Sequence, residues 1–147
     1  ERTLCSANTE VSVVCQTRSW LPAEIGAITW RAMATPCTSV FTPWYYGNPT
    51  IPEAFKNGTN LYTENSAYWT FRDLSRYADV RYQSVSSAIH KRIALFEQKE
   101  FAAQPQWEQE ALRLYGKDKQ QAIRFLAETT NNLATQSVQL GDAMRRQ

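Results

Sequence analysis

The least generic segment of this chain reads Arg18-Ser-Trp-Leu-Pro-Ala-Glu-Ile-Gly-Ala-Ile-Thr-Trp30, and it is continued by Ser39-Val-Phe-Thr-Pro-Trp-Tyr-Tyr-Gly47. The segment begins at the end of one stretch of alternating apolar and polar residues. It then passes through a turn into a second stretch of the same kind. Pro22 and Gly26 are residue types that end strands and permit such turns. Polar and aromatic side chains gather where these runs end. We therefore expect the later chain to pack around a small sheet built from this segment.

The alternation of apolar and polar residues predicts three strands, at residues 11–18, 27–33 and 38–42. Their short connections favour antiparallel pairing. In the first strand, three residues share the face that we expect to be buried: Val11, Val13 and Cys15. Residues 43–63 follow as an irregular loop rich in Pro and Gly, with one short helical turn at residues 53–56.

The loop also carries the aromatic run Trp44-Tyr45-Tyr46. Two interpretations stay open for these rings: they pack against the body of the protein, which we favour, or they form the wall of a pocket.

Residues 64–147 are predicted to be helical. From Tyr68 to Phe96, apolar residues recur every three or four positions, which predicts a helix over residues 66–103. A straight helix of that length would span ~57 Å, whereas a compact domain of this size is ~40 Å across. Because no Pro or Gly interrupts it, we expect a continuous helix along the flank of a larger body, rather than a bend.

Two further helices are predicted after this one. Pro105 suits the first turn of a helix that ends at Gly116. Asp118 caps the last helix, and the Thr and Ser residues along its apolar seam suggest that it is peripheral. Together the elements predict an α+β fold, in which a short antiparallel sheet precedes a mainly helical C-terminal region. We treat residues 1–147 as one domain, with strands and the aromatic loop at 1–63 and helices at 64–147.

Composition excludes several classes of protein. The 147 residues suit a single domain. The net charge is only +2 and the basic residues are scattered, so we expect no nucleic-acid partner. No apolar run approaches the ~20 residues of a membrane-spanning helix. Glu1 is not an initiator Met, so we expect that a segment preceded it.

The three cysteines are Cys5, Cys15 and Cys37. They lack the CxxC spacing typical of zinc sites, so no metal is expected. Cys5 could pair with Cys37, but the sequence does not decide it. Cys15 lies in an apolar strand pattern and is expected to pack in the core. The single histidine, His90, is expected to be exposed on a helix rather than to act as a base.

Arg18 and Trp20 are the candidate substrate-binding residues. Arg18 stands at a strand end beside Trp20, and a guanidinium there could hold a carboxylate through two parallel hydrogen bonds. The alternative, weighed equally, is a structural salt bridge to Glu24 or another acidic residue. No HExxH, P-loop or GxSxG motif is present.

Several uncommon residues recur in the order of a known family. They are Gln16-Thr-Arg-Ser-Trp-Leu-Pro-Ala-Glu-Ile-Gly26, Trp30, Thr38-Ser-Val-Phe-Thr-Pro-Trp-Tyr-Tyr-Gly47, Ile51-Pro52, Asn65-Ser-Ala-Tyr-Trp-Thr-Phe71 and Phe96-Glu97. Over about residues 10–115, the chain resembles the C-terminal half of the dipeptidase family of N-terminal-nucleophile hydrolases.

The resemblance implies a fragment of an αββα sandwich from an enzyme that cleaves small peptides without a metal or other cofactor. The nucleophile of such enzymes is a cysteine at the mature N-terminus, whose own amine is the base. Since the match is to the part after the nucleophile, no catalytic residue is assigned here, and the isolated chain is expected to be inactive. Expected partners are a small peptide, the N-terminal remainder of the enzyme and, as an open question, a second copy. A secreted or periplasmic location is favoured over the cytoplasm.

Two other functions stay open. The first is a non-catalytic binding module that uses Trp44, Tyr45 and Tyr46 to hold sugars or peptides. The second is a helical interaction protein that pairs through its last helix.

Overall fold

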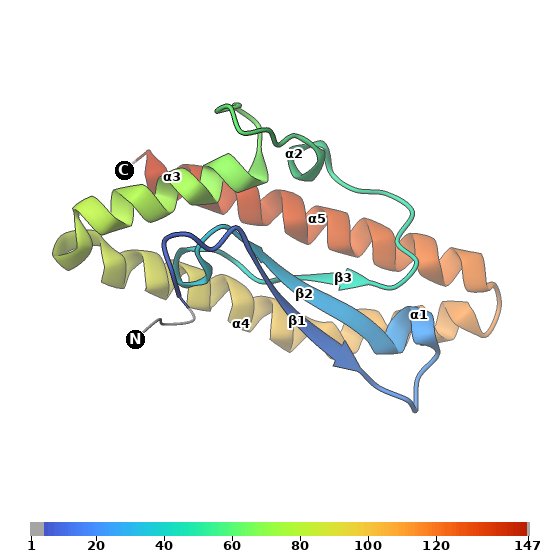
Figure 1. Ribbon diagram of the computed structural model, residues 1–147. Coiled ribbons are helices and arrows are strands. Elements are labelled where there is room, and N and C mark those ends of the chain that lie inside the picture. Colours follow the sequence, from blue (N-terminus) through green and yellow to red (C-terminus); the bar gives the residue numbers. More distant parts are fainter. Residues whose placement is uncertain (1–4, 147) are drawn as a thin grey trace.

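The computed structural model describes residues 5–146, apart from the side chain of Tyr82; residues 1–4 and residue 147 lie outside the described residues. The elements are β1 (Val11–Thr17), α1 (Ala23–Gly26), β2 (Ala27–Met33), the 3-10 turn η1 (Pro36–Thr38), β3 (Thr42–Tyr45), α2 (Glu53–Lys56), α3 (Ala67–Val80), α4 (Tyr82–Tyr115) and α5 (Lys119–Arg145). The predicted α+β fold, a short sheet followed by helices, is confirmed (Figure 1).

The sheet has the order β1-β2-β3, and both pairs of neighbouring strands are antiparallel. The first two strands lie where the sequence predicts them. The third was predicted at residues 38–42 but runs from Thr42 to Tyr45. The reason is local, because the N–H and the hydroxyl of Thr38 both bond to the carbonyl of Thr35. These bonds form the η1 turn, and the chain becomes extended only after it.

Helices α4 and α5 cover one face of the sheet (Figure 1). Ile28 and Trp30 of β2 point to this side and pack in one cluster with Ala111 of α4 and Leu126 of α5. Among residues 5–146, no helix runs along the opposite face of β1 and β2, although α3 reaches this face at its Met33 end. We call this face the open face.

Strand β1 is an edge strand, and its predicted faces are reversed. Three residues that we expected to be buried lie on the open face: Val11, Val13 and Cys15. The register pairs Val14 with Trp30 and thereby places Val14 on the helical side. Both faces of the strand carry apolar residues, and Val13 and Val14 are 49% and 55% exposed. Alternation alone cannot choose the inner face of such a strand, and Cys15 is therefore an exposed thiol rather than a core residue.

The predicted continuous helix over residues 66–103 is wrong. The helix breaks at Arg81, whose φ of −122° and ψ of 33° are not helical, and α3 and α4 form a hairpin (Figure 1). Phe71 of α3, Ile93 of α4 and Met144 of α5 share one buried cluster. Burying apolar surface in this cluster offsets the lost helical hydrogen bonding at the break, so the chain bends although no Pro or Gly marks the place.

Pro105 does not begin a helix as predicted but lies inside α4. It is exposed, so water reaches the carbonyl that its missing N–H leaves free. The helix ends at Gly116 and the next is capped by Asp118, whose side chain accepts a hydrogen bond from the N–H of Gln120, both as predicted. None of the helices in residues 5–146 combines the length and the hydropathy that crossing a membrane requires.

Helix α5 was expected to be peripheral but is central. It contacts α3, α4 and β3. Nine of its residues are buried: Ala122, Leu126, Ala127, Thr130, Ala134, Ser137, Val138, Gly141 and Met144. Most of them are small, so the helix approaches its neighbours closely. The low hydrophobicity of this seam therefore reflects close packing rather than exposure.

Cys5 and Cys37 form a disulfide that ties the segment before β1 to η1. The pairing that the sequence left open is thus made, and the thiol of Cys5 is not available as a nucleophile. Cys15 remains as the free cysteine among residues 5–146.

We expect Gly141→Ala to destabilise the protein. A Cβ atom on Gly141 would lie 2.8 Å from Cγ2 of Thr70 and 3.1 Å from Cε1 of Phe71. Overpacking of this kind costs about 1–3 kcal/mol, which exceeds the gain in helix propensity of about 1 kcal/mol. Thermal unfolding should show a lower Tm.

Gly116→Ala is the matched control, because its nearest neighbours would be at 3.8 Å. A Gly141→Ala variant with an unchanged or higher Tm would show that α3 and α5 pack less tightly than described.

Candidate functional site

Arg18 is held between the short helix α1 and helix α4. Its Nη1 and Nη2 atoms donate to Oε2 and Oε1 of Glu108 at 2.6 and 2.7 Å, and Nη2 also donates to the carbonyl of Ile25 at 2.9 Å. The salt bridge is the alternative that the sequence left open for this residue. Its partner is Glu108 and not Glu24, which instead pairs with Lys119 at 2.6 Å.

Glu108 is the centre of a wider polar network. Its Oε1 atom also accepts from the hydroxyl of Tyr45 at 2.7 Å and from Nε2 of Gln104 at 2.9 Å, while Nε1 of Trp107 donates to the Tyr45 hydroxyl. Burial alone would raise the pKa of Glu108, but the hydrogen bonds from Arg18, Gln104 and Tyr45 outweigh it and hold the pKa below its ordinary value. Glu108 is therefore a stable anion.

Arg18 and Trp20 line the same depression, which has a volume of about 460 Å³. The structure thus brings the two predicted residues together. Trp20 is 77% exposed and can act as a wall, whereas the fork of Arg18 is occupied by Glu108. Gly26 closes the turn beneath them, since a Cβ atom there would lie 2.6 Å from the carbonyl oxygen of Arg18.

A second depression, of about 420 Å³, lies on the open face. It shares Thr17 and Ala27 with the first, so the two hollows adjoin. Its other lining residues include Cys15, Thr29, Arg31, Trp44, Tyr46, Asn48 and Ile51. Arg31 was not among the predicted site residues, although its alternation with Trp30 in the second predicted strand places the two side chains on opposite faces of the sheet.

The aromatic run is divided between the two sides of the sheet. Tyr45 is buried against α4 and belongs to the Glu108 network. Trp44 and Tyr46 lie on the open face, and the ring of Trp44 packs against Phe55 with centroids 5.2 Å apart. The three rings therefore do not form one exposed shelf.

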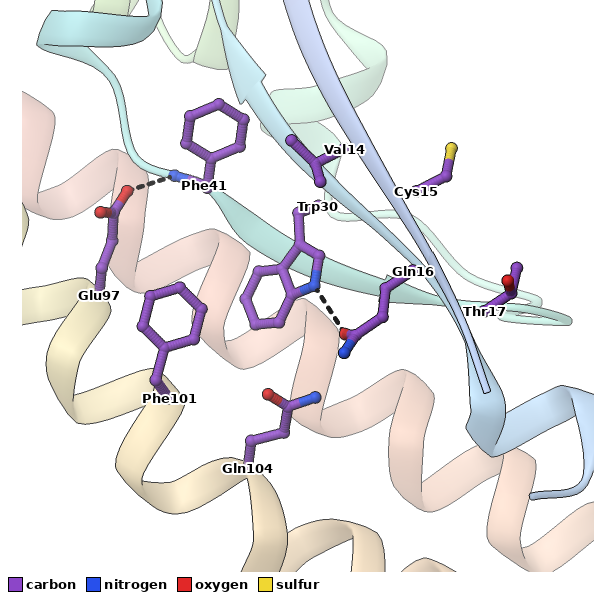
Figure 2. A pocket seen from close by; sticks show the side chains of 9 residues that line it. All are labelled: Val14, Cys15, Gln16, Thr17, Trp30, Phe41, Glu97, Phe101 and Gln104. Carbon is purple, nitrogen blue, oxygen red and sulfur yellow. Dashed lines mark hydrogen bonds between the residues drawn. The ribbon is translucent and has the colours of Figure 1, made fainter. Parts of the chain in front are cut away.

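A third cavity, of about 750 Å³, lies between β1 and α4 on the helical side of the sheet. Figure 2 shows the rings of Trp30, Phe41 and Phe101 around it. At its edges, the Trp30 indole donates to Gln16 Oε1 at 3.2 Å and Glu97 accepts from the N–H of Phe41 at 3.0 Å (Figure 2). The cavity combines these aromatic walls with the polar side chains of Gln16, Glu97 and Gln104, and it borders the free edge of β1.

Glu100 is a buried acid one helical turn after Glu97. It is 2% exposed, and neither carboxylate oxygen has a hydrogen-bond partner among the described residues. Burial, and secondarily the charge of Glu97, raise the pKa of Glu100 to about 8. Sequence analysis missed this residue, although it falls on the apolar stripe of α4.

This pKa makes stability depend on pH. The folded pKa of about 8 lies above the ordinary value of 4.5, so Glu100 destabilises the fold increasingly as pH rises from about 4.5 to 8. We expect Glu100→Gln to raise stability by about 2–4 kcal/mol at pH 8 and much less at pH 5. Tm measured across pH 5–8.5 checks this expectation.

Glu128→Gln, on the exposed side of α5, is the control and should follow the unsubstituted protein. If the Tm of Glu100→Gln and the Tm of the unsubstituted protein changed with pH in the same way, Glu100 would be ionised in the folded protein.

Among residues 5–146, no group of His, Cys, Asp and Glu is arranged to hold a metal ion. His90 is exposed on α4, where the sequence analysis placed it.

Comparison with known proteins identifies one family. The model of peptidase family C69 matches residues 2–94, which is more than half of the chain. A search of curated proteins found no match. The matched segment contains Arg18, Trp20 and Arg31, whereas Glu108 and the whole of α5 lie beyond it.

Proposed function

The chain belongs to peptidase family C69, and we propose on that premise that it is the C-terminal portion of a cysteine-type dipeptidase of the N-terminal-nucleophile class. The family supports a peptidase function. In the proposed enzyme, the nucleophile lies outside these 147 residues, and this chain supplies part of the sheet and one helical layer.

The open face of the sheet supports this proposal. Val11 and Val13 are each 49% exposed there, beside Trp44 and the 65% exposed Tyr46. Apolar surface of this kind gains about 25 cal/mol for each Å² that is buried. A second sheet stacked on this face would bury it, as in an αββα sandwich. The free edge of β1 is equally suited to pairing with a further strand.

The state of the cysteines also supports it. The sulfur of Cys5 is bonded to Cys37, and Cys15 lies in the middle of a strand. Neither offers a thiol beside a free α-amine, which is the arrangement that an N-terminal nucleophile requires.

Activity of the isolated chain tests the proposal. We expect the purified 147-residue chain to hydrolyse no dipeptide, because it lacks nucleophile, base and oxyanion hole. The complete protein should hydrolyse dipeptides in the same assay. Turnover by the isolated chain that disappears in Cys15→Ser would place the nucleophile in this chain and overturn the proposal.

We further propose that Arg18 and Trp20 border the substrate-binding site. In the complete enzyme, Arg18→Lys should lower kcat/KM for dipeptides by roughly ten-fold or more, since a charged hydrogen bond contributes about 1.5–3 kcal/mol. Lysine cannot bridge both oxygens of Glu108, so the turn that carries Trp20 should shift. Arg76→Lys, on the exposed side of α3, should change little.

Trp20→Ala separates a binding role from a structural one. Because Trp20 is 77% exposed, its loss should raise KM without lowering Tm. Full activity with a reduced Tm in Arg18→Lys would show that Arg18 is purely structural.

A non-catalytic binding module is the second candidate, since Trp44 and Tyr46 face one open depression. It would be favoured if the complete protein bound peptides through these two rings without hydrolysing them.

A further inference from the structure

Among the described strand residues, Arg31 is the one charged side chain on the open face. In the register it stands between Val13 of β1 and Thr42 of β3. The other strand residues that share this face are Val11, Val13, Cys15, Thr17, Ala27, Thr29, Met33, Thr42 and Trp44. All of these are uncharged, so the face presents a single positive group on an apolar and aromatic surface.

Among the described residues, the guanidinium of Arg31 has no partner. It is exposed, and it makes no ion pair or side-chain hydrogen bond within residues 5–146. Arg18 differs, because both of its terminal nitrogens are bound to Glu108. Of these two strand-region arginines, therefore, Arg31 has its fork available for a ligand.

The surroundings of Arg31 suit an acceptor group. The depression that it lines has a volume of about 420 Å³, which lies within the range of small-molecule sites. Asn48 lines the same depression, but its Nδ2 atom is covered by other atoms of the protein. The donors that this hollow presents are therefore those of Arg31, and Trp44 and Tyr46 form its aromatic walls.

We propose that Arg31 binds the terminal carboxylate of the peptide substrate on the open face. The inference rests on the proposed function, in which a second sheet covers this face. Covering the face removes water from Arg31, and a buried guanidinium without an anion is strongly unfavourable. A carboxylate matches the guanidinium fork through two parallel hydrogen bonds, and every small peptide with a free C-terminus carries one.

The test compares two substrates in the complete enzyme. The probes are alanyl-phenylalanine and its C-terminal amide, in which the same peptide bond is cleaved but the carboxylate is absent. We expect Arg31→Met to lower kcat/KM for the free acid by about ten-fold to one-hundred-fold and to change kcat/KM for the amide less than about two-fold. Arg31→Lys, which keeps the charge but loses the fork, should lie between the two.

Arg76→Met is the matched control, because Arg76 is also exposed but lies on α3. Equal losses on both substrates would show that Arg31 pairs with a carboxylate of the enzyme itself, and no loss on either would show that it is solvated. Each of these results overturns the inference and leaves the peptidase function intact. Absence of turnover by the unsubstituted enzyme would overturn the proposed function, and the inference with it.

Discussion

The bidentate salt bridge between Arg18 and Glu108 joins the two layers of this structure. The residues are 90 positions apart, and their ion pair connects the end of β1 to helix α4. The side chains are only 14% and 10% exposed, so loss of either partner would leave a buried charge. Such losses typically cost about 3–5 kcal/mol. Through the Tyr45 hydroxyl, the same carboxylate also fixes β3, and the orientation of sheet on helices follows from this one acid.

The two faces of the sheet have different chemistry because only one of them is covered. On the helical side, polar groups such as Trp30 Nε1 and Gln16 Oε1 satisfy one another. On the open face, Trp44 and Tyr46 line the same hollow as Arg31, whose guanidinium has no partner among residues 5–146. Arg18 and Arg31 are the same residue type on neighbouring elements, yet Arg18 is fixed by Glu108 and Arg31 is exposed.

Local patterns predicted much of this fold, and long-range packing decided the rest. Alternation located β1 and β2, and the signals at Gly116 and Asp118 marked helix ends as observed. The sequence could not show which face of β1 points to the helices, because both faces of this strand carry apolar residues.

The break at Arg81 has no signal in the sequence, since burial between α3, α4 and α5 imposes it. At the candidate site, Arg18 and Trp20 were predicted from their place at a strand end, and the structure brings both to one depression. The identity of Glu108 as the partner of Arg18 could not be predicted, because nothing local links residues 90 positions apart.

The position of Glu108 also bears on how much of the chain can fold by itself. The family match ends at residue 94, within α4. A polypeptide cut there would keep Arg18 but lose Glu108, along with Ala111 and Leu126, which cover the inner face of β2. Its sheet would be uncovered on both sides. The region of recognisable family similarity is thus smaller than the packed unit, because the helical layer that covers the sheet is completed only by α5.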